Sequence, residues 1–308
     1  MVLQRVRRMS TKRKRIARGF LLDARGRVSI PFMPSIKKSD LCIPRVAASS
    51  YLNTAPLIWS FQHGTRQGEI ELLTDRAPAR SADALRRHEV EAALVPVIEY
   101  QRIPDVRIVP GVCVGSRRGV RSVVLVTNGK ELSEVETIAL DTSSRTSIAL
   151  VQIIFREFIR REPRYTSTAP DIEAMLEKYD AALLIGDPAM SVAGGGRRVF
   201  DLASVWRERT GLGFVFAVWM VKAHLTKDDA IIRVDWAAAR DEGLAHVEDI
   251  IAAYECDVPL PRDELRTYLR DNICYDLNEE LRAGLELFYR LAYKHELIPR
   301  VRPLEFVR

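Results

Sequence analysis

The sequence lacks any apolar run approaching the roughly 18–20 residues that a membrane-spanning helix needs. Its four cysteines (Cys42, Cys113, Cys256 and Cys274) are scattered, with no CxxC pair and no metal-ligand spacing, and its five histidines do not cluster. These absences argue against a membrane span and against a metal site. Unpaired, scattered cysteines are typical of reduced thiols, so we expect a cytoplasmic protein.

Positive charge is concentrated at one end of the chain. The formal net charge is +6, yet residues 1–40 alone contain twelve Lys/Arg against two Asp, which leaves the remainder mildly acidic. The basic extension lacks the apolar segment and the small-residue cleavage site of a secretory signal. It could contact nucleic acid or anionic lipid by charge alone. We interpret it instead as a solvated, disordered extension, or as part of an over-long reading frame with its true start at Met33, and assign it no function.

The remaining chain is long enough for two domains or for one two-lobed domain. From residue 41 onward, strand and helix patterns alternate: Ile43–Ala48, Leu57–Gln62, Glu71–Leu73, Pro78–His88 and Ala92–Val95. This alternation predicts an α/β fold with a parallel sheet. Ligands of such sheets bind at the carboxyl ends of the strands.

An internal repetition predicts two lobes. A helix, a turn and a buried strand over residues 84–96 recur over residues 175–187. Two apolar strands, Arg121–Thr127 and Phe214–Trp219, are suited to cross between the lobes. We therefore predict a first lobe of residues 41–127 plus 216–308 and a second lobe of residues 128–215. Helices are expected in the C-terminal part, at Trp236–Tyr254, Arg262–Asn272 and Leu277–His295.

The segment Asp141–Ser147 joins the strand Thr137–Leu140 to a helical pattern. Five of its seven residues carry hydroxyls and one is an arginine. The first N–H groups of a helix have no partners within it. The hydroxyls could cap those donors, or the loop could bind an anion. Both interpretations remain open at this point.

Six segments of the sequence follow one another in a recognisable order: Ser50–Leu57, Val95–Tyr100, Val120–Val123, Ser144–Ser147, Ala182–Asp187 and Thr210–Trp219. In order and spacing they resemble the chorismate dehydratases, the first enzymes of the futalosine route to menaquinone. The resemblance covers roughly residues 43–300. It implies a two-lobed fold like that of the type II periplasmic binding proteins, with a cleft between the lobes.

The resemblance implies a lyase that removes water from chorismate, a dianion, to give 3-[(1-carboxyvinyl)oxy]benzoate without cofactor or metal. It assigns catalytic roles to Asn53 and Ser122. Without the resemblance, Asn53 would be a loop-shaping residue before a proline and Ser122 a strand-end hydroxyl. Neither is a strong base, so a carboxylate of the substrate itself would assist proton removal.

Further substrate contacts are expected from both lobes. Ser143, Ser144, Thr146 and Ser147 would surround one carboxylate. Tyr51 belongs to the first of the similar segments.

Three charged residues are further candidates. Arg145 either pairs with the substrate or braces the loop against an acidic neighbour such as Asp187. Glu99 is either a base or a structural acceptor, since a negative charge beside a dianion weakens binding. Asp187 either caps the following helix or lines the cleft.

Three alternatives belong to other classes. A solute-binding protein would share the fold and do no chemistry. A 1,4-dihydroxy-6-naphthoate synthase uses a histidine base, and no histidine stands in or beside the six segments. The effector domain of a LysR-like regulator would need an N-terminal helix-turn-helix, for which forty basic, poorly periodic residues are too short. We expect no nucleic-acid partner, and the oligomeric state stays open.

Overall fold

The computed structural model describes residues 21–22, 28–29, 43–192 and 196–308. The chain divides into two compact units, Met1–Lys38 and Ser39–Arg308. In the first unit, β1 (Leu21–Leu22) pairs antiparallel with β2 (Val28–Ser29). The basic extension predicted over residues 1–40 otherwise lies outside the described residues.

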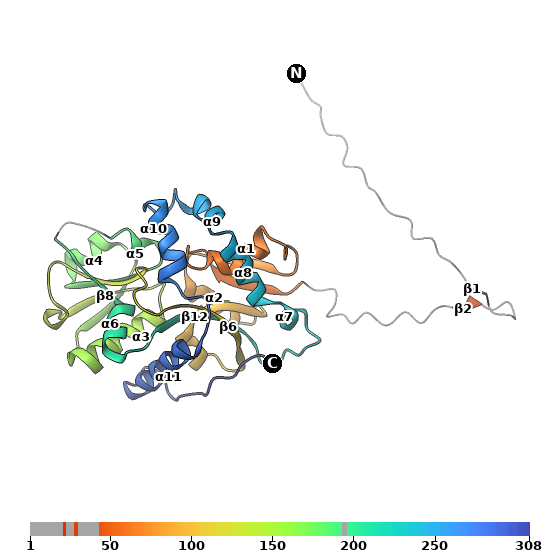
Figure 1. Cartoon of the computed structure of the whole chain (residues 1–308). Coiled ribbons are helices and arrows are strands. Elements are labelled where there is room, and N and C mark those ends of the chain that lie inside the picture. Colours follow the sequence, from red (N-terminus) through yellow and green to blue (C-terminus); the bar gives the residue numbers. More distant parts are fainter. Residues whose placement is uncertain (1–20, 23–27, 30–42, 193–195) are drawn as a thin grey trace, which may run out of the picture. The chain divides into compact units, whose positions relative to one another are not determined.

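The second unit contains two five-stranded sheets with helices around them (Figure 1). The first sheet has the order β4-β3-β5-β12-β6. Its strands are β3 (Arg45–Ser49), β4 (Glu71–Asp75), β5 (Ala92–Pro96), β6 (Val106–Ser116) and β12 (Phe214–Lys222). The first three are parallel, as predicted, whereas β12 runs antiparallel to both β5 and β6. The sheet is therefore mixed.

The second sheet has the order β11-β7-β10-β8-β9 and is mixed in the same way. Its strands are β7 (Val123–Thr127), β8 (Thr137–Asp141), β9 (Arg164–Thr168), β10 (Ala181–Ile185) and β11 (Arg198–Asp201). Here β8, β9 and β10 are parallel, and β7 runs antiparallel to β10 and β11. The repeated helix–strand pairs that predicted two lobes are α2–β5 and α4–β10.

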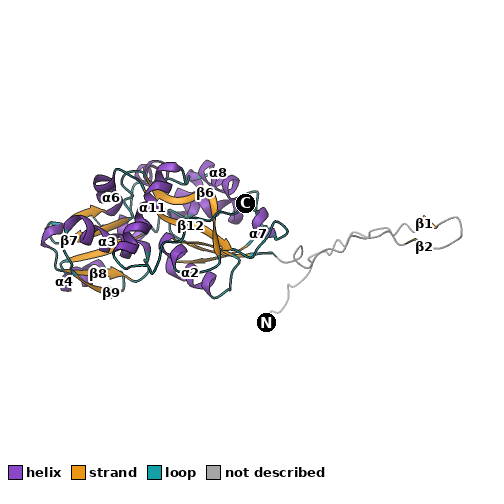
Figure 2. Cartoon of the chain, turned by 90° about the horizontal axis from the view of Figure 1, so that it is seen from below, coloured by secondary structure: helices purple, strands orange, loops and turns teal. Residues whose placement is uncertain are grey.

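Helices cover both sheets, and Figure 2 shows α3, α4 and α6 beside the second sheet and α2, α7 and α8 beside the first. The α-helices before β12 are α1 (Ala55–Gln62), α2 (Pro78–Arg86), α3 (Thr146–Ile153), α4 (Ile172–Lys178), α5 (Asp187–Met190) and α6 (Leu202–Thr210). Those after it are α7 (Ala230–Arg233), α8 (Trp236–Ala245), α9 (Val247–Tyr254), α10 (Arg262–Thr267) and α11 (Glu279–Lys294). Short 3₁₀ turns are η2 (Val97–Gln101) and η3 (Leu132–Glu134), and π-helical turns η4 (Ile154–Ile159) and η5 (Tyr268–Asn272) extend α3 and α10.

The structure has two lobes, but the chain passes from one sheet to the other at different places than the sequence indicated. Val123–Thr127, predicted to close the first lobe, pairs with β10 and β11 of the second sheet. The connections lie instead at residues 117–122 and 211–213, between β6 and β7 and between α6 and β12. The lobe boundaries predicted at 127/128 and 215/216 therefore differ from the places where the chain changes sheet, which lie a few residues earlier in both cases. The apolar strands are central strands within sheets, and short polar or glycine-containing segments make the crossings.

The crossing before β12 is closely packed against α11. A Cβ atom at Gly284 would lie 2.1 Å from the carbonyl oxygen of Gly213, so the helix approaches the crossing backbone to backbone. Next to it, Trp206 and Phe288 each meet Phe214 edge to face, with ring centroids 5.3 Å and 5.1 Å from that of Phe214. Residues from both lobes therefore form one apolar core at the junction.

We expect Gly284→Ala to destabilise the protein by about 1–3 kcal/mol or more, because the contact is with backbone atoms that cannot rotate away. Chemical denaturation measures this as a lower midpoint. Ala283→Ser, at the exposed neighbouring position of α11, is the control and should change stability by no more than about 0.5 kcal/mol. Equal stabilities of the two variants would contradict the close approach.

Candidate functional site

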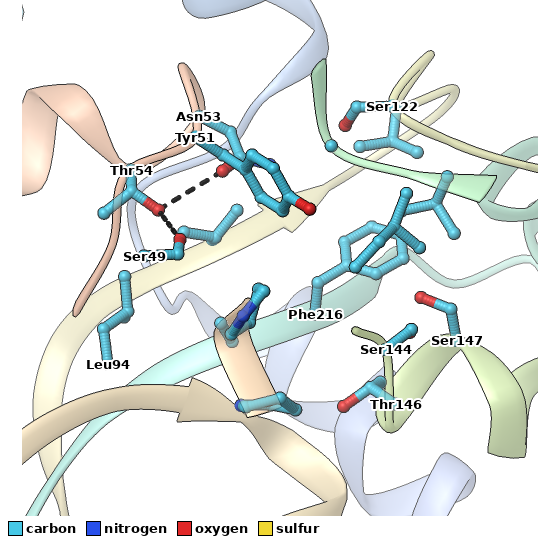
Figure 3. Close-up of a pocket in the computed structure, with 18 of the residues that line it drawn as sticks. Ser49, Tyr51, Asn53, Thr54, Leu94, Ser122, Ser144, Thr146, Ser147 and Phe216 are labelled. Carbon is cyan, nitrogen blue, oxygen red and sulfur yellow. Dashed lines mark hydrogen bonds between the residues drawn. The ribbon is translucent and has the colours of Figure 1, made fainter. Parts of the chain in front are cut away.

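A cavity between the lobes is lined by residues from all six of the segments singled out in the sequence. The empty space at this central cavity amounts to about 590 Å³ when the open solvent at its mouth is included. Its polar lining consists of Ser49, Tyr51, Asn53, Thr54, Ser122, Ser144, Arg145, Thr146 and Ser147. Apolar walls come from residues such as Leu94, Val114 and Phe216. Figure 3 shows hydroxyl groups of the two lobes on opposite sides, with the Phe216 ring between them.

The first lobe presents Asn53 through a chain of hydrogen bonds. The hydroxyls of Ser49 and Thr54 lie 2.7 Å apart, and the Thr54 hydroxyl donates to Asn53 Oδ1 at 3.3 Å (Figure 3). This bond uses one of the two acceptor sites of the Asn53 amide oxygen, and the NH₂ group of Asn53 is a donor. Ser49 and Thr54 were not among the site residues expected from sequence, although Thr54 lies in the segment Ser50–Leu57 and Ser49 directly before it.

The second lobe contributes the loop between β8 and α3. Ser144, Thr146 and Ser147 line the cavity and are almost completely buried. The Thr146 hydroxyl accepts a hydrogen bond from the Ile98 backbone N–H of the first lobe, at 3.3 Å. Neither α3 nor α1, which begins beside Asn53, has a side-chain cap. The N-terminus of α3 therefore reaches the cavity without a side-chain cap, an arrangement suited to negative charge. At the start of α1 the N–H groups of Ala55 and Leu57 are bonded to backbone carbonyls, and Pro56 has none.

Ser122 lies where the first crossing enters β7. It is fully buried, lines the cavity, and its hydroxyl has no hydrogen-bond partner among the described residues. Its backbone carbonyl accepts from the Gly186 N–H at 2.8 Å, which fixes its position. A buried hydroxyl without a partner costs stability unless a ligand or water satisfies it.

Arg145 braces the loop rather than facing the cavity with a free charge. Its guanidinium donates to Glu99 at 2.9 Å and to Asp83 at 2.7 Å, both in the first lobe. Of the two interpretations of Arg145, the structure therefore favours bracing, but with Glu99 and Asp83 in place of Asp187.

Glu99 does not line the central cavity. Its buried carboxylate also contacts Arg86 and Arg102 and is thus surrounded by three guanidinium groups. This environment supports the structural interpretation of Glu99, since its carboxylate is engaged by three guanidinium groups away from the central cavity.

Ser143 and Asp187 lie in a second, outer pocket, which Tyr51 and Arg76 also line. The Ser143 hydroxyl donates to Asp141 at 2.6 Å, and the Asp187 carboxylate accepts from the Leu52 N–H of the other lobe at 3.0 Å. Neither residue lines the central cavity, contrary to the expected grouping with Ser144 and Thr146. Ser143 is held there by hydrogen bonds from its N–H and its hydroxyl to the Asp141 carboxylate.

Tyr51 separates the two spaces, since it lines both. Its ring packs on Gly186 of the second lobe, where φ is +67° and a Cβ atom would come within 2.6 Å of the ring. The contact requires glycine, because any side chain would push the lobes apart.

Within the part of the chain that the structure describes, no three His, Cys, Asp or Glu side chains gather as a metal site would require. The same residues contain no helix with the length and apolar character of a membrane span. No histidine is among the described residues that line the central cavity.

Comparisons with known proteins agree with this geometry. A family model described as menaquinone biosynthesis matches residues 44–294. A chorismate dehydratase of Thermus thermophilus is 31% identical over 256 residues, 77% of this chain and 91% of the relative. A crystal structure of a protein from Archaeoglobus fulgidus has a TM-score of 0.68 at 22% identity, covering 83% of this chain and 98% of that one. The periplasmic aliphatic sulphonate binding protein of Escherichia coli has a TM-score of 0.59 at 17% identity, covering 85% and 93%. These two likenesses confirm the predicted periplasmic-binding-protein-like fold.

The Asp187 carboxyl generates a prediction about pH. Burial raises its pKa to about 6, although the Leu52 hydrogen bond acts in the opposite direction. Because this pKa lies above the unfolded value, the stabilisation is complete below about pH 4 and is lost as the pH rises through 6. Asp187→Asn keeps an acceptor for Leu52 without the charge. We expect its melting temperature, relative to the unsubstituted chain, to increase between pH 4 and pH 7.

Thermal melts across this pH range measure the difference. Asp271→Asn, which removes an exposed carboxylate, serves as the control and should show no comparable trend. A difference for Asp187→Asn that is independent of pH would contradict the raised pKa.

Proposed function

Since this chain belongs to the menaquinone biosynthesis family, we propose that it is a chorismate dehydratase, a hydro-lyase that forms 3-[(1-carboxyvinyl)oxy]benzoate. The observation that carries the proposal is the convergence of Asn53, Ser122 and the Ser144–Ser147 loop on one cavity between the lobes. These residues lie far apart in the sequence and belong to the segments on which the resemblance rests.

The chemistry asks little of the protein beyond orientation. A ring C–H bond and the ring C–OH bond break, a carbon–carbon double bond forms, and the proton and hydroxide leave together as water. The product ring is aromatic, so the driving force lies in the substrate. Holding the reacting groups in place and stabilising developing charge supply most of the acceleration.

The cavity suits a dianion held by neutral donors. The uncapped N-terminus of α3 would favour one carboxylate. The hydroxyls of Ser144, Thr146 and Ser147 would add donors around one carboxylate. The side-chain charge of Arg145 is already balanced by Glu99 and Asp83.

We assign Asn53 and Ser122 to the reacting part of the substrate. The Asn53 NH₂ group would hold the departing hydroxyl or a carboxylate, and the Ser122 hydroxyl would donate to a carboxylate. Neither group is a strong base at neutral pH. In this proposal a carboxylate of chorismate accepts the ring proton, and the protein fixes the geometry. Scattered cysteines fit a cytoplasmic location for the enzyme.

Incubation of the purified chain with chorismate, with product followed by chromatography, tests the activity. We expect Asn53→Ala and Ser122→Ala to lower kcat/KM by about 10²-fold or more each. Each substitution removes a hydrogen-bond donor from a site where such donors orient the substrate and stabilise developing charge. Binding of chorismate without turnover would favour a solute-binding role instead.

Matched controls are available for both substitutions. Ser81→Ala removes another buried serine hydroxyl without a described partner, in α2 away from the cavity lining. Asn128→Ala removes an amide that donates to the Leu176 carbonyl in the second lobe. Both should retain turnover, and an active Asn53→Ala/Ser122→Ala double variant would refute the assignment of the two residues.

A further inference from the structure

Tyr268 stands behind the central cavity in the π-helical turn η5. Its side chain is fully buried, and its hydroxyl has no hydrogen-bond partner of adequate geometry among the described residues. π-helical turns inside helices are frequent at functional sites, because they shift a side chain out of the regular helical pattern. The sequence offered no sign of this, since a tyrosine on a helix beside apolar residues is typical of core.

An ion pair ties the helix of Tyr268 to the segment of Ser122: Arg121, next to Ser122, pairs with Glu264, one helical turn before Tyr268. The side chains of Ser122 and Asn53 are near enough to affect the pKa of the Tyr268 hydroxyl. These are the two side chains assigned to the reacting part of the substrate. Ser122 is itself fully buried and without a partner. Two neighbouring buried hydroxyls, neither engaged, cost stability that a phenylalanine and an alanine would avoid. Such an arrangement is expected where a ligand completes the hydrogen bonds.

The phenol can act here only as a donor or acceptor of a hydrogen bond. Burial raises the pKa of Tyr268, so the hydroxyl keeps its proton at neutral pH. A serine hydroxyl has one proton and two acceptor sites. If Ser122 accepts from Tyr268, its own proton is free to point into the cavity.

We propose that Tyr268 is a positioning residue whose O–H donates to Ser122 Oγ and so directs the Ser122 proton toward a carboxylate oxygen of the bound substrate. The ligand oxygen completes a two-step donor chain that is open in the empty cavity. This inference rests on the proposed function. It concerns a residue that does not itself line the cavity.

A double-mutant cycle in kcat/KM tests the inference, with chorismate as the substrate. Tyr268→Phe should lower kcat/KM by about 10- to 100-fold, the effect of one well-placed hydrogen bond. In the Ser122→Ala background the same substitution should change kcat/KM by less than about 3-fold, because its target is gone. A merely structural role would give losses that multiply.

The control is Tyr275→Phe. Tyr275 is also a buried tyrosine whose hydroxyl has no partner among the described residues, and it does not line the central cavity. This variant should keep its turnover. The melting temperature of Tyr268→Phe should not fall, since the hydroxyl removed is unpartnered, and a large fall would overturn the inference.

Two failures can be told apart. A chain that converts chorismate, but whose Tyr268→Phe variant is fully active or whose losses multiply, overturns the role of Tyr268 alone. A chain that neither converts chorismate nor binds it in calorimetry overturns the proposed function and this inference with it.

Discussion

The salt bridges of Arg145 hold the site together. This residue precedes α3 in the second lobe, yet its guanidinium is bound by Glu99 and Asp83 of the first. Because the backbone on either side carries Ser144 and Thr146 into the cavity, the ion pairs fix these hydroxyls relative to Asn53. The Thr146–Ile98 hydrogen bond does the same one residue further. A positive charge that faced the substrate would attract it. The charge of Arg145 is instead paired between the lobes, where it fixes the positions of the loop residues.

That use of charge explains the character of the cavity. The one charged side chain of the described lining, Arg145, is paired with Glu99 and Asp83, and the other polar groups there are hydroxyls, one amide and the N-terminus of α3. Such donors attract anions without a proton equilibrium near neutral pH. A reaction that needs a dianion oriented, rather than a strong acid or base, is well matched by them.

Local sequence patterns predicted most of the strands. They failed where the assignment of a strand to a lobe depends on residues that are close in space but distant in sequence. The strands Arg45–Ser49 and Ala92–Pro96 were recognisable because each is apolar and bounded by turns. Val123–Thr127 looks alike, but its lobe depends on pairing with β10, which no local pattern contains.

The same limit applied to the site. The hydroxyl loop was identified from composition, yet whether Ser143 or Ser144 faces the cavity depends on backbone direction. The partners of Arg145 lie 46 and 62 positions away, beyond any periodicity. Tyr268 carried no signal at all, because burial beside Ser122 is a property of the folded chain.

The packing of Tyr51 on Gly186 bears on exchange with solvent. The ring belongs to one lobe and the glycine to the other, and together they stand between the central cavity and the outer pocket. A ligand passing on that side must part them, and the Asp187–Leu52 hydrogen bond bridges the same two loops. Hinge motions of this kind occur in microseconds to milliseconds and commonly govern how fast product departs. A side chain at position 186 would therefore change the contact that a ligand has to pass on that side.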